Sequence, residues 1–183
     1  MYIDKEYLSV VFSELEENLK KYSLPLWDEL PDIELYMDQV ISLLPKYLEI
    51  YHSALGDKII TPSMINNYVK LKFIPPPVKK KYSKMHLAYL LIICTLKQTL
   101  DMATIQKIMP VGIDEEDIKK TFDSFVKNQR KAYSYVTESM KNVADPILKF
   151  ESDNQERLND LLMQVSASAN IFKIFTDKIT RQP

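Results

Sequence analysis

Residues 60–109 read ITPSMINNYVKLKFIPPPVKKKYSKMHLAYLLIICTLKQTLDMATIQKIM. Thr61-Pro62 predicts a helix start, because a threonine cap is followed by proline at the first helical position, where its missing N–H costs nothing. Ser83 and Asp101 are expected to cap two further helices. The three prolines at 75–77 separate the first helix from the second. The stretch therefore predicts a helix, a proline-lysine turn and two more helices.

Helical periodicity assigns a face to each of these elements. On the first helix the expected inward stripe is Met64, Ile65, Tyr68, Val69 and Leu71, and the expected outward residues are Ser63, Asn66, Asn67 and Lys70. Residues 73–74 and 78–82 flank the prolines and are expected to be extended, forming a minimal two-stranded wing. Residues 87–96 are apolar nearly all round, which predicts a helix at the centre of the core.

The charge of the chain is strongly polarised. Residues 58–109 hold nine lysines against one acid, for a net charge of +8, whereas residues 1–57 hold four lysines against twelve acids. The whole chain has a net charge of only −1. Positive charge confined to one segment is the expected footprint of phosphate binding.

The rest of the chain predicts an all-α protein, since only two of its 183 residues are glycine. Residues 3–19 have the pattern of an amphipathic helix, and the leucines and Trp27 of the next segment indicate a linker held against the body. Asp32 is expected to cap the next helix, and Pro45 to kink it or to start another that ends at Gly56.

Beyond Gly112 two long helices are expected. One begins in the acidic cluster 114–117, and Asp145-Pro146 is expected to start the last helical stretch. The apolar stripe of this last stretch, from Leu158 to Ile179, packs either against another helix of the same chain or against a second copy. The predicted organisation is an N-terminal helix and linker at 1–30, a DNA-binding domain at 31–110 and a C-terminal helical dimerisation or sensor region at 111–183.

The location expected for the chain is the cytoplasm, with no membrane association. The N-terminus lacks the basic and uninterrupted apolar regions of a signal peptide. The longest apolar run, residues 87–94, is far too short to span a bilayer.

Residues 61–109 resemble the MerR-type winged helix-turn-helix regulators. The likeness is carried by Thr61, Ile65, Tyr68, Phe73-Ile74-Pro75, Lys81-Tyr82-Ser83, Leu87, Leu90, Leu96 and residues 102–108. A closer resemblance is to an uncharacterised Gram-positive bacterial domain of unknown function, labelled a predicted transcriptional regulator. It is carried by LPDIELYMDQV (30–40), ITPSMINNYVK (60–70), PPPVKKKYSKMHL (75–87) and LKQTLDMATI (96–105). The resemblance implies a MerR-like core that binds double-stranded DNA, with a minimal wing.

The candidate DNA contacts divide into base and phosphate groups. Asn66 and Asn67 lie where a recognition helix meets base edges, and an asparagine amide can bond adenine in a bidentate way. The alternative is a local bond to the backbone. The lysine run is either a solvated turn or a set of phosphate contacts. The predicted DNA-binding residues are Ser63, Asn66, Asn67, Lys70, Lys72, Lys79, Lys80, Lys81 and Tyr82.

No pattern predicts an enzyme, a cofactor, a metal site or a particular small-molecule effector. His52 and His86 lack partners at metal spacing, and Cys94 is expected to be a small core residue. The leading prediction is a sequence-specific transcriptional regulator that acts as a homodimer. The alternative is a protein-interaction adaptor that uses a helix-turn-helix body and does not bind DNA.

Overall fold

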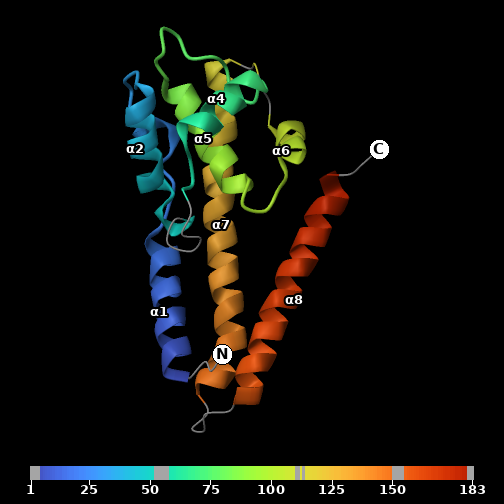
Figure 1. The fold of residues 1–183 in the computed structure, drawn as a ribbon. Helices are drawn as coiled ribbons and strands as arrows, with labels where there is room; N and C mark the ends of the chain where they lie inside the picture. Colours follow the sequence, from blue (N-terminus) through green and yellow to red (C-terminus); the bar gives the residue numbers. More distant parts are fainter. Residues whose placement is uncertain (1–4, 52–57, 110–111, 113, 150–154, 181–183) are drawn as a thin grey trace. The chain divides into compact units, whose positions relative to one another are not determined.

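The chain is all-α over residues 5–51, 58–109, 112, 114–149 and 155–180, which are the residues described by the computed structural model (Figure 1). This confirms the predicted class. In these ranges the extended pairing is limited to two isolated antiparallel bridges, Leu35 with Tyr82 and Val78 with Lys81. No helix in the described ranges has the length and apolarity needed to cross a membrane.

The described residues contain one 3-10 helix and α-helices of seven to thirty-four residues. Their bounds are α1 (Lys5–Lys21), the 3-10 helix η1 (Trp27–Glu29), α2 (Met37–Tyr47), α4 (Pro62–Lys70), α5 (Lys84–Leu96), α6 (Met102–Ile108), α7 (Glu115–Leu148) and α8 (Gln155–Thr180). The chain divides into two compact units. Unit 1 comprises residues 1–22 and 131–183, and unit 2 comprises residues 23–130.

Helix α5 forms the centre of unit 2, as its apolar pattern predicts. Every residue from His86 to Cys94 is buried. Helices α2 and α4 lie against one another, and α2 also contacts α5 (Figure 1). Each fully buried leucine or isoleucine contributes about 1.5–3 kcal/mol relative to an exposed one, so this helix dominates the stability of the unit.

The segment before α2 is held against the first half of α7. The backbone N–H of Trp27 donates to Asp123 Oδ1 at 2.8 Å, and Lys119 forms an ion pair with Asp28 at 2.9 Å. Arg130 donates to the carbonyl oxygen of Leu24 at 3.2 Å. Leu24, Trp27 and Leu30 are buried, which confirms that the predicted linker is pinned to the body.

Two predicted helix boundaries are wrong. Asp32 does not cap α2, which begins at Met37, because the backbone of Leu35 exchanges two hydrogen bonds with Tyr82 and is extended. Pro45 lies inside α2, which continues to Tyr47; the backbone turns at Leu48 and is helical again at residues 49–51, and the stop expected at Gly56 lies outside the described residues. Asp145-Pro146 does not start a helix. In the last turn of α7, proline removes only one intrahelical hydrogen bond, and the helix continues to Leu148.

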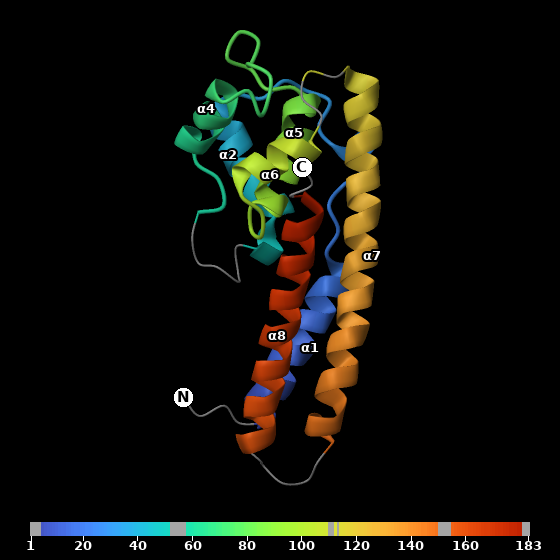
Figure 2. The same ribbon diagram turned by 90° about the vertical axis from the view of Figure 1, so that its right-hand side faces the viewer.

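Unit 1 contains α1, the second half of α7 and α8 (Figure 2). Tyr22 and Tyr133 bring α1 and α7 together, with ring centroids 5.7 Å apart. Lys20, by its side-chain hydrogen bond, lowers the pKa of Glu16, and the charge of Lys141 on α7 acts in the same direction. Among the described residues of this unit, the buried apolar side chains are Ala144, Leu158 and Leu161.

His86 fastens the start of α5. Its Nδ1 accepts the backbone N–H of Ser83 at 3.0 Å, so the predicted cap residue is held by the histidine rather than by its own hydroxyl. The His86 ring packs edge-on against Tyr82, with centroids 5.4 Å apart. Burial lowers the pKa of His86, and the carbonyl groups of Pro75 and Pro76, which favour the charged ring, only partly oppose it.

Protonation of His86 should therefore destabilise the protein. Because the pKa of His86 in the folded protein is below its ordinary value of 6.5, the contribution of neutral His86 is fully present above that pH and is lost as the pH falls toward the folded pKa. We expect the free energy of unfolding to decrease as the pH falls below 6.5, and His86→Gln to flatten this decrease. Denaturant titrations at several pH values measure it. The pH dependence of stability would not come from His86 if its slope were unchanged in His86→Gln and flattened in the control His52→Gln.

Candidate nucleic-acid interface

Helix α4 presents its predicted polar face to solvent. Thr61 Oγ1 accepts the backbone N–H of Met64 at 3.3 Å, which confirms the cap. Ile65 and Tyr68 are buried, and burial raises the pKa of Tyr68 to about 12. The side chains predicted to face outward are all exposed: Ser63, Asn66, Asn67 and Lys70. Of the predicted inward stripe, Met64 and Val69 are half-buried and Leu71 is exposed.

The C-terminal end of α4 is closed by a Schellman motif with Lys72 in the left-handed position. The N–H of Phe73 donates to Tyr68 O at 2.8 Å, and the N–H of Lys72 donates to Val69 O at 3.0 Å. The Tyr68 and Phe73 rings pack edge to face, 6.3 Å apart, which supplies the apolar contact of this motif. Lys72 has φ 59°, a conformation in which glycine is the usual residue.

The predicted wing is a two-residue turn. Val78 and Lys81 exchange two backbone hydrogen bonds, of 3.1 and 2.9 Å, across Lys79 and Lys80. Those two lysines have φ 49° and 64°. Positive φ at both central positions is the signature of a type I′ turn, which favours Asn-Gly. The expected pairing of residues 73–74 with 78–82 is not found among the described residues, because the N–H of Phe73 donates to Tyr68 O and Tyr82 pairs with Leu35 instead.

Lys72, Lys79 and Lys80 are the non-glycine residues with positive φ in the described chain, and all three are exposed. The left-handed conformation costs an L-residue about 1–2 kcal/mol, a cost that glycine avoids and asparagine reduces. Within the described residues none of the three forms an ion pair or a side-chain hydrogen bond that would offset this cost. The chain therefore holds three cations in solvent at a cost in backbone stability.

Lys81 and Tyr82 differ from the other predicted contacts. Lys81 forms an ion pair with Glu34 at 3.4 Å, and its Nζ lies 5.8 Å from the centroid of the Tyr36 ring. Tyr82 is only 3% exposed, so its predicted place on the surface is wrong, and its ring belongs to the core. The bridge to Leu35 explains this, because it anchors Tyr82 beside α2.

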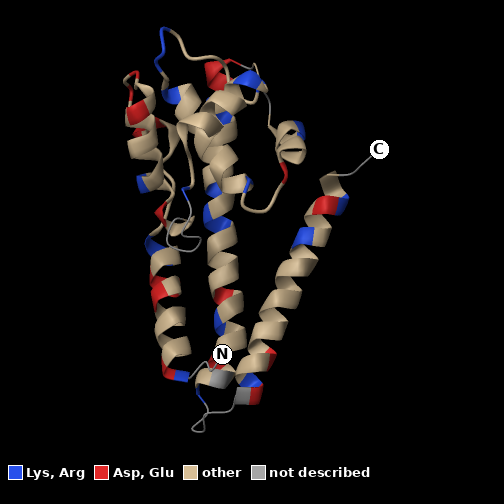
Figure 3. Cartoon of the chain, in the orientation of Figure 1, with Lys and Arg blue, Asp and Glu red and all other residues tan. Residues whose placement is uncertain are grey.

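The turn, α4 and α2 share one surface of unit 2. A shallow groove is lined by Lys80 from the turn, Pro62 from α4, and Tyr36, Met37, Asp38, Ile41 and Ser42 from the start of α2. Figure 3 shows basic residues on α4 and on the connection to α5, and acidic residues near the start of α2. The predicted contacts from α4 and from the lysine turn thus lie at neighbouring places on the surface.

Other sequence candidates have structural explanations. Asp114 Oδ1 accepts the N–H of Asp117 at 2.9 Å, so the acidic cluster caps α7. Cys94 is fully buried, and burial raises its pKa to about 11. His52 lies outside the described residues. The roles of Glu34 and Tyr36 were missed, because only the Leu35–Tyr82 bridge brings them to the lysines.

Residues 25–138 match a family described as a domain of unknown function, DUF1836, over more than half of the chain. The chain belongs to the DUF1836 family. The matched segment includes nearly all of unit 2 and every residue of the candidate interface. No curated protein and no solved structure matches the chain. The DUF1836 description specifies no activity, so the function has to be argued from the site.

Replacing the left-handed lysines should stabilise the protein. We expect the double variant Lys79→Asn with Lys80→Gly to raise the free energy of unfolding by about 1–2 kcal/mol. The single variant Lys72→Gly should raise it by about 1–2 kcal/mol as well. Asparagine and glycine adopt a positive φ at a lower cost than lysine. Denaturant titration measures the change. Lys70→Gly is the matched control, because that residue lies within α4 and glycine there should destabilise by about 1 kcal/mol. Destabilisation by Lys72→Gly equal to that of Lys70→Gly would contradict the proposed strain.

Proposed function

We propose that this protein is a sequence-specific DNA-binding transcriptional regulator, with unit 2 as a MerR-like winged helix-turn-helix reader. Helix α4 is the recognition helix, and residues 73–82 are a minimal wing. The observation that carries the proposal is the placement of Lys72, Lys79 and Lys80 at positive φ, exposed and without ion pairs in the described residues. Strained residues of this kind are typical of functional sites.

In this proposal the affinity for DNA depends on where the lysines lie and not on the net charge of unit 2. Residues 23–130 hold fourteen basic and thirteen acidic residues, so unit 2 is nearly neutral. Attraction to phosphate must therefore come from the few cations that no acid neutralises. Among the lysines that form no ion pair in the described residues, Lys70, Lys72, Lys79 and Lys80 lie on or beside α4 and the turn, whereas Glu34 neutralises Lys81.

Base recognition falls to the exposed face of α4. Ser63, Asn66 and Asn67 project from the first two turns of this helix, which is where recognition helices contact base edges. The asparagine amide matches the N6 and N7 groups of adenine in the major groove. These three short side chains leave the helix free to approach the floor of the groove.

The alternative function, a protein-interaction adaptor, is favoured by one observation. A second shallow groove, lined mainly by apolar surface, lies along α2 between Pro31 and Lys46. Ile33 on its edge is 64% exposed. An adaptor would bind protein there and show no salt-dependent affinity for duplex DNA. Selection from random duplex DNA with the purified protein separates the two functions, because only a DNA reader enriches a sequence.

The exposed turn lysines should determine the salt dependence of DNA binding. Each phosphate contact contributes about 0.9 to the slope of log affinity against log salt, so Lys79→Ala with Lys80→Ala should reduce this slope by about 1.8. Alanine keeps the strained φ of lysine, so stability should change little. Lys81→Ala should have a smaller effect, because Glu34 already pairs with this lysine.

The measurement is fluorescence anisotropy on a labelled duplex between 50 and 200 mM salt, a range in which phosphate contacts change affinity strongly. Lys107→Ala is the control, since this exposed lysine lies on α6. Equal losses in the control and in the double variant would show that the turn is not a specific contact.

Asn66 and Asn67 should determine sequence preference. Loss of a bidentate contact to adenine costs roughly 1–3 kcal/mol on the selected site and much less on a scrambled duplex. Asn66→Ala and Asn67→Ala should therefore lower the preference ratio more than the general affinity. Competition titration measures the ratio, and circular dichroism confirms folding. Should both variants keep the wild-type ratio, α4 is not the recognition helix.

A further inference from the structure

Unit 1 is a set of helices with almost no core of its own. Of the thirty buried apolar residues in the described chain, twenty-seven lie in unit 2. Of the eighteen exposed large apolar residues, thirteen lie in unit 1. Ordering each residue costs about 1–2 kcal/mol of backbone entropy, which three buried apolar side chains cannot offset. Helices of this composition require a further covering surface.

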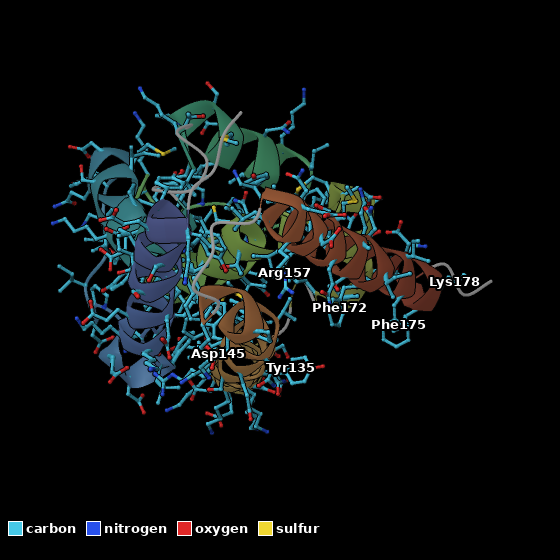
Figure 4. All side chains as sticks on the ribbon, turned by 90° about the horizontal axis from the view of Figure 1, so that it is seen from below. Tyr135, Asp145, Arg157, Phe172, Phe175 and Lys178 are labelled. Atoms are coloured by element: carbon cyan, nitrogen blue, oxygen red, sulfur yellow. The ribbon has the colours of Figure 1, made fainter. Side chains whose placement is uncertain are left out.

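The uncovered surface is most continuous on α8. Leu158, Leu161, Val165, Phe172 and Ile179 recur at spacings of three, four and seven residues, which places them on one stripe of the helix. The first two are 2% and 7% exposed, and from Val165 onward the same stripe is 47–58% exposed. Phe175, at its edge, is 63% exposed. Figure 4 shows the Phe172 and Phe175 rings projecting from the same side of α8.

We propose that a second copy of this chain covers this stripe, with the two α8 helices packed antiparallel about a two-fold axis near Ser168 and Ala169. The middle of the helix reads Ser-Ala-Ser-Ala over residues 166–169, and such short side chains allow the two axes to approach closely. Pairing about this point places Phe172 against the partner's Val165. The contact is isologous, so each copy supplies both surfaces.

Charge favours the antiparallel arrangement. The N-terminal part of α8 carries Glu156, Arg157 and Asp160, for a net charge of −1, and the C-terminal part carries Lys173, Asp177 and Lys178, for a net charge of +1. Antiparallel pairing brings each end beside the opposite end of its partner, whereas parallel pairing brings like net charges together. The helix dipoles also oppose one another in the antiparallel pair.

The exposed aromatic surface supplies a substantial share of the area that a specific contact buries. Specific interfaces bury about 1,200–2,000 Å² in total. An aromatic side chain contributes about 150–250 Å² when fully buried, so four phenylalanines from two chains supply on the order of 500 Å² at their present exposure. Val165 and Ile179, each about half exposed, extend the stripe in both directions along α8.

The first test is the mass of the full-length protein by sedimentation equilibrium. We expect twice the chain mass of 21.4 kDa, and a dissociation constant raised at least about 100-fold by Phe172→Glu with Phe175→Glu. Met163→Glu is the matched control. Met163 lies on the opposite side of α8 and is 67% exposed, so this variant should stay dimeric. A monomeric wild-type protein, or equal weakening by the control, would overturn the proposal.

The second test fixes the orientation with otherwise native chains. Val165→Cys and Phe172→Cys are prepared separately, one with a size tag, then mixed and oxidised. Antiparallel pairing gives mainly the mixed cross-linked dimer, whereas a parallel pair gives cross-links within each variant alone. Wild-type protein is the control, because its one cysteine, Cys94, is fully buried. Absence of the mixed product would overturn the antiparallel arrangement, and neither test involves DNA.

Discussion

The absence of a polar face on α5 is the constraint on which unit 2 depends. A helix buried from His86 to Cys94 is stable in water only when other elements surround it. Helix α2 lies against α5. The 35–82 bridge and the proline segment hold the start of α5 in place. The bridge at Tyr82 then determines where the lysine turn lies, because the turn, residues 78–81, directly precedes Tyr82. The position of the candidate interface is thus a consequence of core packing.

Local sequence chemistry predicted the helices whose ends it controls. Thr61 and Asp101 cap α4 and α6 through their own side chains, and each side chain accepts a backbone N–H only three residues later in the chain. Long-range contacts overrode the local signals elsewhere. Asp32 has the chemistry of a cap, but the bridge between Leu35 and Tyr82, forty-seven positions later, keeps Leu35 extended. Asp145-Pro146 has the pattern of a helix start, yet it lies within the last turn of an existing helix.

The sequence predicted which residues form most of the candidate site, but only part of their arrangement in space. Periodicity correctly placed Ser63, Asn66, Asn67 and Lys70 on the exposed face of α4. It could not show that Lys81 pairs with Glu34, because residues far apart in sequence meet only in the fold. A lysine pair also carries no signal of positive φ, since lysine seldom adopts it. Backbone geometry was therefore needed to distinguish Lys79 and Lys80 from an ordinary solvated run.

The left-handed lysines also bear on how this chain changes over evolutionary time. Lysine and asparagine codons differ only in their third base, so a single nucleotide change at residue 72, 79 or 80 yields a residue better suited to the observed φ. Mutation and selection for stability would therefore act together to remove these cations. Lysine can persist at such positions only where selection for its charge outweighs the benefit of a relaxed backbone. On this reasoning, related chains in which these three charges are not needed should acquire asparagine or glycine at these positions first.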